Sequence, residues 1–182
     1  MNSRFRLVEV YGSLLLSSER EETLKKNGKP NGIMKEVGKV ERKGWKLSFD
    51  RYSEKKKPAQ AVLNLVYTGN QEDVFYTTVY EVDLIAYRKI LNREMGKYTA
   101  KRWKHGRLSD VSSYRPIQLD SEFGITDIFV IPFHGRQRAQ TDSKASYVKT
   151  VQEGIEKSYT DEKQREANLK ALKRAVEESK NI

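Results

Sequence analysis

Residues 4–16, RFRLVEVYGSLLL, constrain the fold of this chain most, because a strand pattern in them runs directly into a glycine turn. The alternation along FRLVEV, residues 5–10, predicts a β-strand. The pattern stops at Tyr11-Gly12-Ser13, where Gly12 tolerates backbone angles that a residue with a Cβ resists. Successive N–H groups in such a turn can converge on an anion. The plain alternative is a turn that only ends the strand.

Composition excludes several kinds of site. The chain has 182 residues and no cysteine, so disulfides, thiolate nucleophiles and cysteine metal sites are excluded. His105 and His134 are its only histidines, which argues against a multi-histidine metal site and against a Ser-His-Asp triad. We therefore expect neither a metal nor a cofactor.

The hydropathy pattern gives no sign of a membrane protein. No apolar run approaches the roughly 20 residues that span a bilayer, and the N-terminus lacks the long apolar segment of a signal peptide. We therefore expect an intracellular, cytoplasmic protein. The net charge of +10 implies attraction to something acidic, either nucleic acid, an anionic metabolite or an acidic protein. Charge alone does not choose among these partners.

The middle of the chain changes its hydrophobic period at Asp83. The strand pattern of residues 74–82 ends there, and Asp83 is a plausible N-cap for a helix that runs to about residue 93 or 94. Tyr87, Ile90 and Leu91 have the i, i+3, i+4 spacing of one apolar helix face. Glu94 continues that series as its only carboxylate. The alternative is that Glu94 has already left the helix and faces water.

The remaining patterns predict short strands joined by polar loops, followed by helices. Strands are expected at residues 45–49, 60–67, 97–103, 114–119 and 126–133, with loops at 27–32 and 53–58. A helical segment begins at about residue 143, and Thr160 is expected to cap its second helix. Six or seven strands with these helices predict one α+β domain over residues 1–182, built on an antiparallel or mixed sheet.

Four segments resemble the γ-glutamylcyclotransferase family. They are VYGSLL after the first strand, GWKLSFD, the run from EDVFYTTVYEVD through LIAYRKILNREMGKY, and the closing SYVKTVQEGIEKSYTDEKQREANLKAL. They occur in the family's order, and the likeness extends from about Phe5 to Leu172. The resemblance implies a partly open β-barrel with flanking helices.

The resemblance also implies a reaction. Members of the family cyclise the γ-glutamyl group of an amino acid, a peptide such as glutathione, or an amine to 5-oxoproline, and the amine is released. The substrate's own α-amine attacks its γ-carbonyl, so proximity supplies much of the rate. The protein must hold the α-carboxylate and must move a proton from the ammonium to the leaving amine.

The matching positions give these tasks to particular residues. Glu94 matches the family's acid/base, and its place beside an apolar helix face suits that role because desolvation favours a neutral acid. The remaining matches, all assigned to substrate binding, are Val8, Glu9, Val10, Tyr11, Gly12, Ser13, Tyr98 and Tyr147. Without the resemblance, the two later tyrosines would be read as core or rim aromatics.

Three departures from the family pattern leave catalysis open. Leu14 replaces an Asn found in many relatives, Leu91 replaces an Asp, and Thr77-Thr78 replaces a central-strand glycine. A degenerate domain that kept only a binding cavity is therefore an alternative to the enzyme.

The runner-up is a binding module for an anionic ligand, nucleic acid or an acidic partner. Lys101, Arg102 and Lys104 lie in a basic stretch that also contains aromatics, and such a surface can follow phosphates. The simplest alternative is that this basic stretch is a solvated loop without a binding role. A third alternative is that it lies around the active site and steers an acidic substrate toward it. The oligomeric state is left open.

Overall fold

The computed structural model describes residues 4–53, 60–95, 114–130 and 145–180. The chain forms two compact units. The first unit comprises residues 1–10, 17–40 and 78–132, and the second unit comprises residues 11–16, 41–77 and 133–182.

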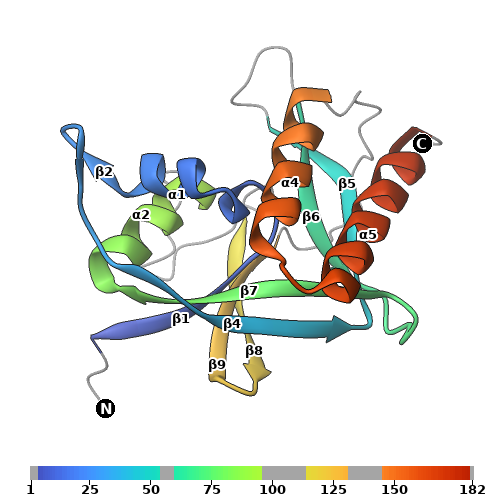
Figure 1. Ribbon diagram of the computed structural model, residues 1–182, viewed down its shortest axis with the longest axis horizontal. Helices are drawn as coiled ribbons and strands as arrows, with labels where there is room; N and C mark the ends of the chain where they lie inside the picture. Colours follow the sequence, from blue (N-terminus) through green and yellow to red (C-terminus); the bar gives the residue numbers. More distant parts are fainter. Residues whose placement is uncertain (1–3, 54–59, 96–113, 131–144, 181–182) are drawn as a thin grey trace. The chain divides into compact units, whose positions relative to one another are not determined.

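A five-stranded mixed sheet contains the first strand of the chain. Its order is β4-β7-β1-β9-β8, and its strands are β1 (Phe5–Val10), β4 (Met34–Lys43), β7 (Val74–Asp83), β8 (Arg115–Ser121) and β9 (Gly124–Val130) (Figure 1). β1 runs antiparallel to β7 and parallel to β9. The central place of β1 explains why Val8 and Val10 are buried. The predicted mixed α+β fold is confirmed, and in the part of the chain that the structure describes the sheet is not closed into a barrel.

Helix α2 (Leu84–Met95) begins where the sequence predicts it. The Asp83 carboxylate accepts a hydrogen bond from the backbone N–H of Ala86 at 2.7 Å, which is the expected N-cap contact. Within the first unit, the hydroxyl of Tyr87 donates to the buried carboxylate of Asp127 at 2.7 Å. Arg6 lies over the same tyrosine ring, 4.7 Å from its centroid. The apolar face of α2 is therefore fixed against β1 and β9.

Helix α1 (Ser17–Leu24) leads into a short hairpin formed by β2 (Lys25–Lys26) and β3 (Lys29–Pro30). Asn27 and Gly28 both have positive φ, at 54° and 77°, as a two-residue hairpin turn with the right twist requires. Residues 27–30 of the predicted loop at 27–32 are thus the turn and second strand of this hairpin.

The second unit combines a strand pair with two helices. β5 (Trp45–Ser53) pairs antiparallel with β6 (Gln60–Tyr67), and α5 (Glu162–Lys180) packs against β5. The other helix is α4 (Ala145–Ser158). The predicted Thr160 cap is wrong: Asp161 accepts the hydrogen bond from the N–H of Gln164 at 2.9 Å. Asp161 immediately precedes the first residue of α5, so it is the N-cap residue and lies closer to the free N–H groups of the first turn than Thr160 does.

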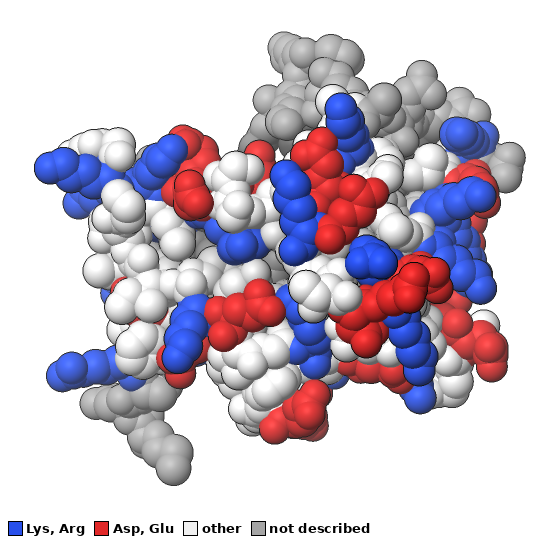
Figure 2. All heavy atoms as spheres, viewed as in Figure 1, with Lys and Arg blue, Asp and Glu red and all other residues white. Residues whose placement is uncertain are grey.

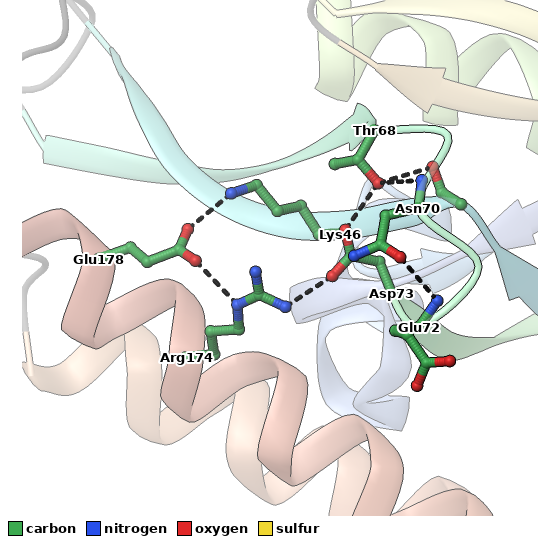
Figure 3. Close-up of polar contacts among 8 residues, drawn as sticks. Lys46, Thr68, Asn70, Glu72, Asp73, Arg174 and Glu178 are labelled. Carbon is green, nitrogen blue, oxygen red and sulfur yellow. Dashed lines mark hydrogen bonds and ion pairs between the residues drawn. The ribbon is translucent and has the colours of Figure 1, made fainter.

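A chain of ion pairs holds α5 in the second unit (Figure 3). Arg174 donates to Asp73 at 2.6 Å and to Glu178 at 2.8 Å. Lys46 of β5 reaches the other oxygen of Glu178 at 2.8 Å. The hydroxyl of Thr68 also donates to Asp73 at 2.6 Å, so that carboxylate ties α5 to the turn before β7.

Acidic and basic side chains alternate over the surface of α5, as Figure 2 shows. Among the described residues, no helix is long and apolar enough to cross a membrane.

Candidate functional site

The chain turns sharply directly after β1. Tyr11 is extended, Gly12 has a φ of 81°, and residues Gly12–Leu15 form the short 3-10 helix η1. The N–H of Leu16 closes the turn on the carbonyl of Ser13 at 3.1 Å. The predicted turn is confirmed, and a left-handed φ gives a physical reason for glycine at position 12.

Tyr147 lies beside this turn, within the second unit. A Cβ added at Gly12 would lie 3.8 Å from the Tyr147 hydroxyl and 3.5 Å from Cδ2 of Leu63. The structure therefore brings together two residues that the resemblance assigns to substrate binding, although they are far apart in the sequence.

The ring of Tyr147 is oriented by Phe49, which is buried on β5. The two rings meet edge to face, with centroids 6.3 Å apart and an interplanar angle of 84°. Such a pair favours one ring orientation, so Phe49 helps to set where the Tyr147 hydroxyl points. The sequence predicted a strand at residues 45–49, which lies within β5, but nothing local in the sequence indicated this partner.

Glu94 lies in the last turn of α2, so the alternative that it has left the helix is not what the structure shows. Its side chain is 19% exposed, and its Oε1 is 3.4 Å from Nε of Arg93. Arg93 itself is held by α1, because it donates to Glu19 at 2.9 Å and to Thr23 at 2.6 Å. A cation with a fixed position therefore lies beside the predicted acid/base. Sequence reasoning missed Arg93, which is outside the apolar stripe.

The three predicted residues on β1 are buried. Val8 and Val10 belong to the core, and Glu9 is 2% exposed. The Glu9 carboxylate accepts a hydrogen bond from the hydroxyl of Thr126 on β9. These side chains support the strand that leads into the turn.

The departures from the family pattern are absorbed by packing. Leu14 and Leu91 are both buried. The hydroxyl of Thr78 accepts a hydrogen bond from Nζ of Lys39 at 3.0 Å. The residues that this chain has in place of the family's residues therefore add to the core or to its polar contacts.

Several predicted residues lie outside the described part of the chain. They are Tyr98 and the basic residues Lys101, Arg102 and Lys104. The same holds for the strand expected at 97–103 and for most of the loop at 53–58. Glu94 belongs to the first unit and Gly12 to the second, so the prediction that both act on one substrate stays a prediction. Among the described residues, no group of three or more His, Asp or Glu could hold a metal ion.

Comparison with solved structures finds several similar chains, and two of them match along most of this chain. An uncharacterized protein from Homo sapiens matches with a TM-score of 0.59 and 13% sequence identity, over 92% of this chain and 88% of that one. A γ-glutamyl cyclotransferase matches with a TM-score of 0.57 and 12% identity, over 96% of this chain and 99% of that one. No protein-family model and no curated protein sequence matches this chain. At such identities the likeness concerns the fold.

Proposed function

Because this chain has the γ-glutamyl cyclotransferase fold, we propose that it is an enzyme of that type. It converts the γ-glutamyl group of an amino acid, peptide or amine to 5-oxoproline and releases the amine. The observation that supports this most is the Tyr147 hydroxyl beside Gly12, because both residues are assigned to the substrate by the resemblance.

The reaction needs no group beyond substrate and protein. The α-amine nitrogen forms a bond to the γ-carbonyl carbon, and the bond from that carbon to the leaving nitrogen breaks. The α-ammonium loses two protons as its nitrogen becomes the lactam N–H of 5-oxoproline, and the departing nitrogen gains two protons as it leaves as an ammonium. Because nucleophile and electrophile belong to one molecule, a folded-back substrate already has a high effective concentration of nucleophile.

The turn after β1 is proposed to hold the α-carboxylate. Gly12 at a φ of 81° permits a backbone whose N–H groups can converge on an anion without a charged side chain. The Tyr147 hydroxyl next to this turn supplies a further contact for the glutamyl group.

Glu94 is proposed to move the proton. A carboxylate that is largely shielded from water is suited to general acid/base work. Arg93 lies beside it and balances its charge while the carboxyl is ionised.

The test is to incubate the purified chain with a panel of γ-glutamyl amino acids, peptides and amines and to follow 5-oxoproline by mass spectrometry. The Gly12→Val variant should lose both ligand binding and turnover, because it strains the backbone and fills the turn. Gly69→Val is the matched control, since Gly69 also has a positive φ of 71° but has no atom within 4 Å of its Cβ position.

Failure of the wild-type protein to form 5-oxoproline from any panel member would overturn the proposed enzyme. If it binds these compounds without turning them over, the domain is a degenerate member that acts as a binding module.

A further inference from the structure

One face of α4 is directed at the turn after β1. Tyr147, Gly154 and Ser158 are seven and four residues apart, so they lie on the same side of the helix. Tyr147 is near Gly12, as described above, while the other two residues meet the end of η1. The Ser158 hydroxyl donates to the carbonyl of Leu15 at 2.8 Å.

Gly154 allows this approach. A Cβ at Gly154 would lie 2.9 Å from Cβ of Leu15 and 3.3 Å from the backbone nitrogen of Leu16. Real Cβ atoms essentially never approach other heavy atoms to 2.9 Å. A glycine at this position therefore lets the helix come close enough for Ser158 to reach the Leu15 carbonyl.

The next residue, Tyr159, forms a hydrogen bond with β7 beyond the point where β1 stops pairing with that strand. Pairing of β1 with β7 ends at Val10 opposite Thr78, and the same register would place residue 12 opposite Tyr76. The Tyr159 hydroxyl donates to the carbonyl of Tyr76 at 2.7 Å. The side chain of Asn168 also bonds to the backbone of Tyr76. It accepts from the Tyr76 N–H at 2.6 Å and donates to the Tyr76 carbonyl at 2.9 Å, and so takes the place of a neighbouring strand.

We propose that Ser158 is a positioning residue for the Gly12–Leu15 turn, with Gly154 as the contact that makes its hydrogen bond possible. Tyr159 and Asn168 satisfy the backbone of Tyr76, so the chain is free to turn at Gly12 without leaving buried polar groups unpaired. Ser158 then fixes the far end of that turn.

This role rests on the proposed function where it concerns the substrate. A group of backbone N–H donors binds a carboxylate well only while the donors keep their orientation. Loss of the hydrogen bond from Ser158 to Leu15 loosens the turn and therefore weakens substrate binding. Glu94, which is proposed to move the proton, is not changed. KM is expected to rise with little change in kcat.

The experiment compares Ser158→Ala with Ser158→Thr, which keeps a hydroxyl, and with Thr150→Ala as a matched control. Thr150 also donates to a backbone carbonyl within α4, that of Ser146 at 3.0 Å. Amide hydrogen exchange of the peptide covering residues 12–16 is measured by mass spectrometry, together with KM and kcat for an active panel member.

Ser158→Ala should speed exchange in that peptide and raise KM by about 2–10-fold, the usual worth of one hydrogen bond. Ser158→Thr should restore both values, and Thr150→Ala should change neither. Unchanged exchange in Ser158→Ala overturns the inference, and so does faster exchange with KM unchanged in an active enzyme. If the wild-type chain makes no 5-oxoproline, the proposed function fails, and the exchange measurement alone decides whether Ser158 holds the turn.

Discussion

Asn168 is a buried polar side chain that forms two hydrogen bonds with the backbone of one residue. Its amide both accepts from and donates to Tyr76, as a neighbouring strand would. A carboxamide offers a donor and an acceptor side by side, whereas an ionised carboxylate offers acceptors alone. Asn168 therefore specifies where the second unit's helices meet β7, and this choice has an energetic consequence that can be measured.

Asn168→Asp should destabilise the protein by about 1–3 kcal/mol or more at neutral pH. The substitution keeps the shape but replaces the donor with an oxygen that faces the Tyr76 carbonyl. Urea unfolding of the variant and of the exposed control Asn92→Asp measures the difference. The interpretation is wrong if the two variants are equally stable, within about 0.5 kcal/mol.

At the scale of the element, α5 depends on carboxylates that must stay ionised. Burial alone would raise the pKa of Asp73, but hydrogen bonds from Thr68 and Arg174 outweigh it and hold that pKa below its usual range. Burial likewise acts to raise the pKa of Glu178, and hydrogen bonds from Lys46 and Arg174 lower it on balance. A lowered pKa in the folded state means that both groups stabilise the fold when ionised.

The free energy of unfolding should therefore decrease as the pH is lowered. The contribution of a carboxyl with a lowered pKa is complete above its ordinary value of about 4, and it is lost as pH drops through the folded-state value. Asp73→Asn should cost about 1–3 kcal/mol at pH 7, because it breaks the pair with Arg174. The difference from wild type should shrink as the pH is lowered toward about 2.

Urea unfolding across this pH range makes the measurement, with the exposed neighbour Glu72→Gln as control. A gap between Asp73→Asn and wild type that is as wide at low pH as at pH 7 would show that the charge of Asp73 does not stabilise α5.

Elements with strong periodicity could be predicted from the sequence. The first strand, its glycine turn, β5, β6, β7 and α2 follow the patterns closely, and the Asp83 cap was found from its position alone. β4 was missed because it is an edge strand in which only Val40 is buried, so no alternation marks it. Its Gly38 makes room for the ring of Phe123, a contact that no local pattern indicates.

At the scale of the whole molecule, long-range contacts are what the sequence could not supply. Ser158 and Leu15 are 143 residues apart, and Arg174 and Asp73 are 101 apart. The fold itself was predicted from the order of four short motifs, and the comparison with a γ-glutamyl cyclotransferase structure confirms it. The roles of the site residues stay predictions, because 12% identity carries the fold and not the activity.

The most direct test of the central claim is the rate of 5-oxoproline formation by Glu94→Gln. If Glu94 moves the proton, the rate should fall by about 10²–10⁴, the usual worth of a positioned acid/base. Binding of the γ-glutamyl compound should survive, since the turn at Gly12 is unchanged, and Glu72→Gln should keep the wild-type rate. A Glu94→Gln protein that forms 5-oxoproline as fast as wild type would contradict the account.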